Sequence, residues 1–305
     1  MRRLVRLTAW VLGLTLLLSA CGDHKTVETA DVGVQTAPPA EGVTALTLCD
    51  GDVTLRFEKV ENAAWVWQDD PQFPLEQTAL EELLSLPTAL EGGEVVPNAE
   101  DLSIYGLASP TKYITVTSDG ADVTYYIGEQ ATDGRWYVLT PAGTVRFTSD
   151  ENKQLLSRSI YSMAVLPGLP ALSEERVRKV TLTNDEGGTV SFRTGEDGTR
   201  RSGSRDVTAK TDALIKELCG LTLSSCVDYD PAEGAAEVCG LTAPEVTLEV
   251  EYTADNGSER VLTVYVGLPI GDGGRYVTLG GDATIYRMEE TSLVQLLTLA
   301  ETGLN

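Results

Sequence analysis

The stretch 105–110 reads YGLASP, and the stretch 239–244 reads CGLTAP. Both contain a Gly-Leu pair followed three residues later by proline, so that position 106 of the chain corresponds to position 240. In each stretch we expect the glycine to provide a backbone turn, the leucine to fill the core and the proline to set the entry to the next strand. The residues of this expected fold motif are Tyr105, Gly106, Leu107, Pro110, Gly240, Leu241 and Pro244.

Other segments repeat at the same or nearly the same offset. The segment 43–48 (VTALTL) matches 177–182 (VRKVTL) at the offset of the Gly-Leu pairs, whereas the match of 126–128 (YIG) to 265–267 (YVG) has an offset larger by five. This step falls in a turn, where length variation is tolerated. In the first copy the turn contains Asp119-Gly120, which predicts a tight hairpin.

We therefore predict two tandem homologous repeats, residues 43–168 and 169–305. Alternating apolar and polar residues predict strands, and leucines at helical spacing predict helices. The fold class is α+β, and each repeat is a mostly antiparallel β-sheet with two helices. The expected strands are 44–48, 53–59, 64–67, 112–118, 122–127, 135–140 and 144–148 in the first repeat, and 178–183, 189–193, 246–253, 260–267, 274–279 and 283–287 in the second.

Helix ends are predicted from capping residues. Thr78 and Glu81 form a capping-box pattern ahead of a leucine-rich segment, and Ser149 is the expected N-cap of a second helix in the first repeat. In the second repeat we expect helices over 208–218 and 289–301. Each repeat therefore has one helix in the middle and one at its end.

The Tyr-Gly-Leu-x-x-Pro motif at 105–110, the Tyr-Ile-Gly segment at 126–128 and the preceding helix resemble the bacterial lipoprotein family called domain of unknown function 4340. The resemblance covers nearly all of 43–305, once per repeat, and the second repeat departs from it with Cys239 in place of the tyrosine. The resemblance implies a fold, and in that family the motif has no assigned chemistry. Members are often encoded beside ABC-type transporters, which implies, by analogy, an extracytoplasmic partner of a membrane complex.

The N-terminus has the pattern of an export signal. Arginines at positions 2, 3 and 6 precede an apolar run from Leu7 to Leu18, which is shorter than the roughly 20 residues of a membrane-spanning helix. The run ends in Leu18-Ser19-Ala20-Cys21, which resembles the lipobox of bacterial lipoprotein signals. This resemblance implies lipidation of Cys21 and cleavage between Ala20 and Cys21.

We expect residues 1–20 to be a lipoprotein signal peptide and residues 21–42 to be a lipidated cysteine with a flexible tether. The lipid would hold the protein on the extracytoplasmic face of the bacterial cell membrane. The alternative is an ordinary signal peptide that is followed by a cysteine by chance.

The chain is strongly acidic, with 46 Asp and Glu against 23 Lys and Arg. Cleavage before Cys21 removes three arginines, so that 20 basic residues against 46 acidic ones give a net charge of −26. This charge argues against binding nucleic acid and against lying flat on anionic lipid. The only histidine, His24, falls in the expected tether, which excludes His-based triads and His-containing zinc sites from the repeats.

Cysteine and acidic residues give no metal-binding pattern. The cysteines of the repeats are Cys49, Cys219, Cys226 and Cys239. They form no CxxC pair, and the sequence does not decide between free thiols and disulfides, for which three pairings exist. The acidic turns at 50–52 and 271–274 lack the spacing of calcium and phosphate loops. We expect no metal and no cofactor.

Four aromatic residues are candidates for an interaction surface: Trp65, Trp67, Trp136 and Tyr137. Trp65 and Trp67 would share one face of a strand. One interpretation is core packing, and the other is an exposed aromatic face for a partner or glycan. The second repeat has Arg201 and Ser202 in the corresponding region, which favours the exposed face.

Together these features predict a membrane-anchored, non-enzymatic interaction module, accessory to an ABC-type transporter. The alternative is a lipoprotein that binds a small ligand or glycan between the two repeats. A hydrolase that uses paired carboxylates is a third hypothesis, and no sequence motif points to such a pair.

Overall fold

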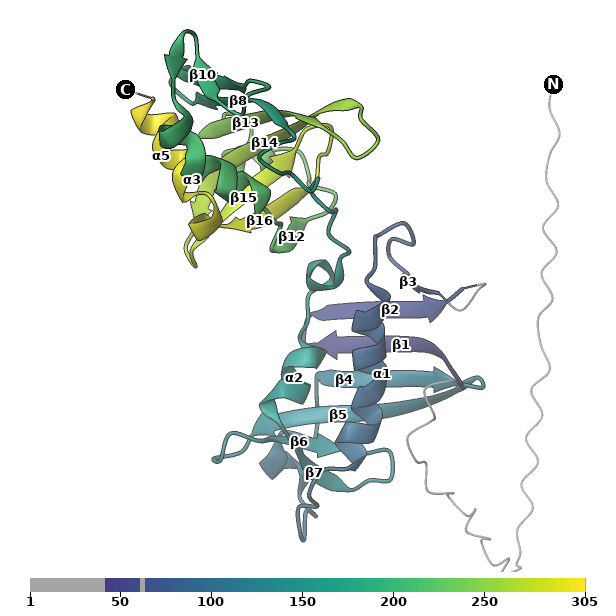
Figure 1. The fold of residues 1–305 in the computed structure, drawn as a ribbon. Coiled ribbons are helices and arrows are strands. Elements are labelled where there is room, and N and C mark those ends of the chain that lie inside the picture. The colour runs from purple at the N-terminus through teal and green to yellow at the C-terminus, as the bar shows by residue number, and fades with distance from the viewer. Residues whose placement is uncertain (1–41, 61–63, 305) are drawn as a thin grey trace, which may run out of the picture. The chain divides into compact units, whose positions relative to one another are not determined.

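The computed structural model describes residues 42–60 and 64–304 (Figure 1). The expected cleavage and lipidation site, Ala20 and Cys21, lies outside the described residues, as does His24. Within the described ranges, no helix is both long and apolar enough to cross a membrane.

The first sheet has the order β3-β2-β1-β4-β5-β6-β7, and its neighbouring strands are antiparallel. Its strands are β1 (Val43–Asp50), β2 (Val53–Lys59), β3 (Trp65–Trp67), β4 (Lys112–Ser118), β5 (Ala121–Gln130), β6 (Trp136–Leu139) and β7 (Val145–Thr148). The helical elements of this part are α1 (Gln77–Glu91), η3 (Leu102–Tyr105), α2 (Asp150–Leu156) and η4 (Ile160–Met163).

The second sheet has the order β11-β10-β9-β8-β13-β14-β15-β16-β12 and is also antiparallel. Its strands are β8 (Val177–Asn184), β9 (Thr189–Thr194), β10 (Arg200–Ser202), β11 (Arg205–Asp206), β12 (Ser225–Asp228), β13 (Val246–Thr253), β14 (Glu259–Ile270), β15 (Gly274–Leu279) and β16 (Ile285–Glu289). Its helical elements are α3 (Thr208–Cys219), α4 (Ala235–Val238), η5 (Glu290–Ser292) and α5 (Val294–Thr302).

The central strands of the two sheets follow one order. β2-β1-β4-β5-β6-β7 in the first sheet corresponds to β9-β8-β13-β14-β15-β16 in the second. The tight turn between β4 and β5 has positive φ at both Asp119 and Gly120, as a two-residue hairpin requires. The fold is therefore α+β with antiparallel sheets and few helices, which confirms that part of the prediction.

The helix α1 covers one face of the first sheet because its leucines recur every three or four residues (Figure 1). Its fully buried leucines are Leu80, Leu83, Leu86 and Leu90. They form one core with the inward side chains of β1, β2, β4 and β5. Burial of each leucine contributes about 1.5–3 kcal/mol, so this helix face accounts for much of the packing of the first sheet.

The helices α3 and α5 cover the second sheet, and Glu217 of α3 links the two helices. The carboxylate of Glu217 accepts hydrogen bonds from the backbone N–H groups of Gln295 and Leu296, both at 2.8 Å. These donors lie in the first turn of α5 and have no partner within that helix. Burial raises the pKa of Glu217 above its ordinary value, although the N–H donors oppose the rise.

Two predicted helix starts had different outcomes. Ser149 is the N-cap of α2, and its side chain accepts a hydrogen bond from the backbone of Asn152, as predicted. The capping box at Thr78 is wrong, because Glu76 is the N-cap of α1 and its side chain accepts from the Thr78 N–H at 3.3 Å. The helix contains Pro87 and continues to Glu91.

The sequence prediction missed the short elements β10, β11, β12 and α4, and it extended the last helix too far toward its N-terminus. The expected helix 289–301 consists of the single-turn η5 followed by α5. Segments of two to four residues carry too little periodicity to be recognised, because a periodic pattern needs about 11 residues to be measured.

Candidate functional site

The Gly-Leu motif forms a tight turn in each sheet, which we call the Gly–Leu turn (residues 102–107 and 236–241). Gly106 and Gly240 are left-handed, with φ of 67° and 71°. Leu107 and Leu241 are buried, as expected. Each turn closes on a backbone hydrogen bond from the leucine N–H, to Leu102 O at 2.9 Å in the first and to Ala236 O at 2.7 Å in the second.

A second glycine in each sheet receives this turn. A Cβ atom on Gly128 would lie 2.0 Å from the carbonyl oxygen of Tyr105, and a Cβ on Gly267 would lie 2.3 Å from that of Cys239. Both glycines lie where the strand register shifts, in β5 and in β14. The bulge and the missing side chain together let the turn pack against the strand. In the first sheet, the Gly-Leu motif at 105–110 and the Tyr-Ile-Gly motif at 126–128 are therefore the two halves of one contact. The motifs at 239–244 and 265–267 form the same contact in the second sheet.

The tryptophans of β3 belong largely to the core. Trp65 is buried, and Trp67 is half-buried with its ring 5.6 Å from that of Phe73. The Trp65 backbone points to the outer edge of the sheet, where the Gln77 side chain accepts from its N–H (2.8 Å) and donates to its carbonyl (3.0 Å). The exposed-face interpretation of Trp65 is therefore wrong.

The strand pairing corrects which residue of the second sheet matches Trp65. Trp65 pairs with Lys59, the last residue of β2, and Arg200 pairs with Thr194, the last residue of β9. Arg200 is also buried, and its guanidinium forms an ion pair with Asp212. The structural equivalent is thus Arg200 and not Arg201, and a buried arginine stem fills the place of an indole.

Trp136 also corresponds to a buried arginine in the second sheet. Its indole N–H donates to Asp150 at 3.0 Å, and two lysine ammonium groups lie 5.4 and 5.8 Å from its ring. In the second sheet the register places Arg275 at this position, buried and paired with Glu290 at 3.1 Å. Trp136 is half-buried at the edge of the core and already has polar partners. It is a weaker interaction candidate than Tyr137.

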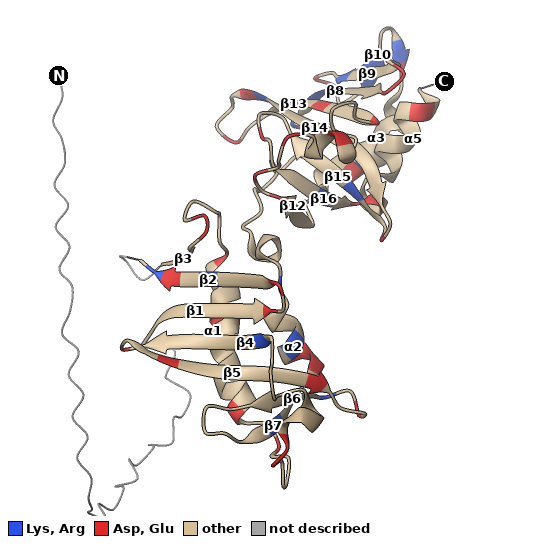
Figure 2. Ribbon diagram, turned by 180° about the vertical axis from the view of Figure 1, so that it is seen from behind, with Lys and Arg blue, Asp and Glu red and all other residues tan. Residues whose placement is uncertain are grey.

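Figure 2 views the first sheet from the side that α1 does not cover. Tyr137 alternates with the core residue Val138 along β6, so its side chain lies on that side. Rows of tyrosine and threonine from neighbouring strands point to this side, because they alternate with core residues. We call this surface the tyrosine–threonine face: Thr47, Tyr113, Thr115, Thr117, Thr124, Tyr126 and Tyr137. All of these side chains are half-buried.

Contacts between the side chains hold this face in order. Tyr113 and Tyr126 have ring centroids 6.1 Å apart, and Tyr137 contacts both Tyr105 (4.8 Å) and Phe147 (5.2 Å). The hydroxyls of Thr115 and Thr124 lie 2.8 Å apart. Burial and the neighbouring Cys49 raise the pKa of Tyr113 above its ordinary value, although Arg56 opposes the rise.

The tyrosine–threonine face carries little charge, although the chain is strongly acidic. Of the described strands, β1, β4, β6 and β7 contribute no charged residue to this side, and β5 contributes Asp122 and Glu129 near its two ends. The charges on the β2 side are Arg56, which pairs with Thr47, and Glu58, which pairs with Ala45. Figure 2 shows the middle of β1, β4 and β5 free of charged residues. Charge depletion around tyrosines is typical of the centre of a protein interface.

The matching side of the second sheet is charged. Lys179 pairs with Glu251 across β8 and β13, with Nζ and Oε1 2.9 Å apart, where the first sheet has Ala45 and Thr117. The partner of Thr181 is Glu249, at the position of Thr115. The low charge of this side is therefore particular to the first sheet.

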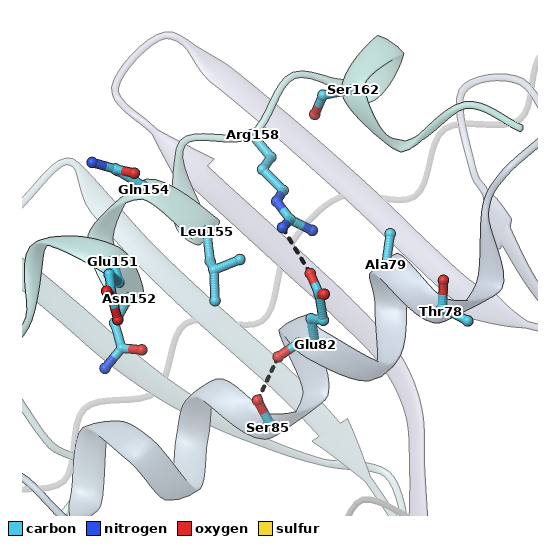
Figure 3. Close-up of a pocket in the computed structure, with 10 residues that line it drawn as sticks. All are labelled: Thr78, Ala79, Glu82, Ser85, Glu151, Asn152, Gln154, Leu155, Arg158 and Ser162. Carbon is cyan, nitrogen blue, oxygen red and sulfur yellow. Dashed lines mark hydrogen bonds and ion pairs between the residues drawn. The ribbon is translucent and has the colours of Figure 1, made fainter. Parts of the chain in front are cut away.

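A polar recess of about 860 Å³ lies between α1 and α2 (Figure 3). Arg158 reaches from the segment after α2 to Glu82 on α1, with a separation of 2.7 Å, and Ser85 donates to the Glu82 carbonyl. The cation that lines the recess is thus already in an ion pair. Because the recess is also open and shallowly spread over two helices, it offers no converging set of polar groups for a ligand.

The cysteines of the described chain are free thiols: Cys49, Cys226 and Cys239 are buried, and Cys219 is exposed. Burial, with Asp228 and Asp282 nearby, raises the pKa of Cys226 to about 11. In the part of the chain that the structure describes, no group of three or more His, Cys, Asp or Glu residues could hold a metal ion.

Comparison with protein families gives one match. The family model described as domain of unknown function (DUF4340) matches residues 65–212, from β3 into α3. This match supports the family resemblance over that stretch and finds one copy of the family model. No curated protein and no solved structure matches the chain.

Proposed function

We propose that this chain, with its match to a family of unknown function, is the precursor of a membrane-anchored extracytoplasmic lipoprotein that acts as a non-enzymatic interaction module. Cleavage before Cys21 and lipidation of that residue would supply the anchor. The basic, apolar and small-residue order of residues 1–21 supports this proposal.

The proposal includes a duplication of the folded unit, as residues 43–168 and 169–305. The common strand order and the matched strand positions, such as Thr115 and Glu249, support it. So do the two Gly–Leu turns, each packed against a glycine in a bulge. One unit could then keep its surface for packing or charge while the other acquired a contact surface.

The observation that carries the proposal is the tyrosine–threonine face. It is the side of the first sheet that α1 and α2 do not cover, and its tyrosines can bury large apolar area while their hydroxyls find hydrogen bonds. Such residues dominate binding energy when a partner covers them and when charges are kept to the rim. The partner would be a protein, and the family resemblance suggests an extracytoplasmic part of an ABC-type transporter, by analogy.

The test compares reciprocal exchanges between the two sheets. Thr115→Glu places a carboxylate in the middle of the tyrosine–threonine face, and Glu249→Thr makes the opposite change at the matching position of the second sheet. Since the second sheet already carries glutamate there, the fold should tolerate both changes. Tryptophan fluorescence would check the folding of the first sheet.

The tagged, full-length protein would be crosslinked in its native membrane. We expect a transporter subunit to be recovered with the wild type and with Glu249→Thr, and to be lost with Thr115→Glu. The same anchor and tether fused to an unrelated folded protein should recover none. Equal recovery with all three forms would refute the role of this face. Recovery of glycan without protein would favour the ligand-binding alternative.

A further inference from the structure

The two most exposed large apolar side chains in the described chain occupy matching positions. Val238 is 78% exposed and Ile104 is 66% exposed, ahead of Val261 at 60%. Each lies two residues before the left-handed glycine of a Gly–Leu turn, Ile104 before Gly106 and Val238 before Gly240. Single exposed apolar residues are ordinary, but the same exposed position in both sheets calls for a reason.

The turns hold these side chains in fixed positions. Gly106 N–H donates to Ser103 O at 3.3 Å, and Gly240 N–H donates to Glu237 O at 2.9 Å, so the backbone on both sides of the apolar residue is bonded. The following leucine is anchored in the interior in each case. A side chain presented on such a rigid turn loses little freedom when a partner binds it.

Ile104 and Val238 have different sequence neighbours, but their own side chains are of the same type. Tyr105 and Cys239 follow the exposed residue, and Ser103 and Glu237 precede it. The exposed residue itself is β-branched and apolar in both turns. Packing within this chain does not explain the agreement, because neither side chain is covered.

Carboxylates surround both turns. Glu100 and Asp101 lie at the first, and Glu233 and Glu237 at the second, all of them exposed. None of the four forms an ion pair among the described residues. The sequence has no Lys or Arg in 92–111 or in 217–259. The exposed charges within both turn segments are therefore acidic. The nearest cations come from other segments and are already paired: Arg135 stacks on Phe147 and pairs with Glu94, and Arg275 donates to the Gly267 carbonyl and pairs with Glu290.

We propose that the two Gly–Leu turns are equivalent docking points, with Ile104 and Val238 inserting into apolar sockets rimmed by Lys and Arg on a protein partner. The inference rests on the proposed function, that this chain is an interaction module. Charge complementarity selects the partner, because the acidic setting attracts a basic rim and repels an acidic one. Two linked points would bind more tightly than either alone.

The first docking point adjoins the tyrosine–threonine face. The ring of Tyr105, next to Ile104, packs against Tyr137 with centroids 4.8 Å apart. One partner can therefore cover both surfaces in the first sheet. The second docking point has no such charge-depleted face beside it and depends on its own turn, with half-exposed Leu268 against Gly240.

The test places a photo-crosslinking benzoylphenylalanine at position 104 or 238 of the full-length protein in its native membrane. Positions 53 and 261 are controls, because Val53 and Val261 are nearly as exposed (58% and 60%) and lie outside the turns. We expect crosslinks several-fold above both controls. The crosslinked partner peptides, sequenced by mass spectrometry, should combine apolar residues with flanking Lys or Arg. Added salt should lower the yield.

Two outcomes would overturn the inference. One is crosslinking at 104 and 238 no stronger than at the controls, and the other is crosslinking to lipid, glycan or acidic peptides. A partner that is still lost with Thr115→Glu while the turns do not crosslink refutes the docking points alone. A protein that recovers no partner by either experiment refutes the proposed function as well.

Substitution gives an independent readout. Ile104→Asp and Val238→Asp remove the apolar group without disturbing the interior, and Val261→Asp adds the same charge elsewhere. We expect each turn variant to weaken partner recovery and the double variant to abolish it, while Val261→Asp leaves recovery unchanged. Full recovery with the double variant would contradict two-point docking.

Discussion

The contact between Gly128 and the first Gly–Leu turn predicts a large effect of one methyl group. In Gly128→Ala the new Cβ would lie 2.0 Å from the Tyr105 carbonyl oxygen and 2.9 Å from Leu107 Cγ, whereas ordinary contacts begin at 3.4 Å. The backbone of the turn would have to withdraw and would take a buried leucine with it. Overpacking of this kind costs about 1–3 kcal/mol, and we expect about 3 kcal/mol because the obstacle is backbone.

The control is Gly120→Ala in the hairpin turn. Gly120 has φ of 76° and nothing within 4 Å of its added Cβ, so the cost is limited to the left-handed conformation, about 1–2 kcal/mol. A comparison of the two variants separates crowding from backbone conformation. Both changes leave the charge and the side chains of the tyrosine–threonine face unaltered.

The assay is urea unfolding of residues 22–305, followed by tryptophan fluorescence. The tryptophans that remain after residue 22 are Trp65, Trp67 and Trp136, all in the first sheet, so the signal reports that sheet. A loss of about 3 kcal/mol would remove a large part of a typical stability of about 5–15 kcal/mol and lower the midpoint in proportion. The matched Gly267→Ala should leave the fluorescence transition unchanged and lower the transition seen by circular dichroism. A Gly128→Ala midpoint equal to or above that of Gly120→Ala would refute the reasoning.

Three further predictions concern buried polar groups. Because the folded-state pKa of Glu217 is raised, stability should fall as pH rises from the unfolded pKa through the folded one, and Glu217→Gln should flatten that slope in urea titrations at several pH values. In the native protein iodoacetamide should label exposed Cys219 first and leave Cys226, with its pKa of about 11, unlabelled until unfolding; equal labelling rates by mass spectrometry would contradict its burial. Arg275→Met should cost about 1–3 kcal/mol by circular dichroism, because the Gly267 carbonyl loses its donor, while the tryptophan transition stays in place.

The central strands were predictable because alternation and the repeat agreed at each position. Strand β2 falls on 53–59 as predicted, and β4 on 112–118. The first helix start was not predictable, because Glu76 and Thr78 are both plausible caps and the choice depends on Gln77, whose amide bonds to Trp65, a residue distant in sequence. Tertiary contacts of this kind leave no local pattern.

The candidate surfaces were predictable only in part. Tyr137 was singled out from the sequence, and its threonine and tyrosine neighbours were not, because threonine in a strand is ordinary β-propensity until the register shows which residues share a face. The exposure of Ile104 and Val238 had no signal beyond the Gly-Leu motif next to them. Trp65 was over-interpreted because the comparison with the region of Arg201 and Ser202 left out its counterpart, the buried Arg200.

The two hydrogen bonds between Gln77 and Trp65, at the outer edge of β3, affect how copies of this protein can associate. An open strand edge offers unpaired N–H and C=O groups to any other strand, and tethering to a membrane confines molecules to a plane, where collisions are frequent. By satisfying both groups of Trp65, a single amide side chain ends the sheet at that edge. On the membrane surface that we propose for this protein, the β3 edge therefore offers no free backbone groups at Trp65 to a strand of a neighbouring copy.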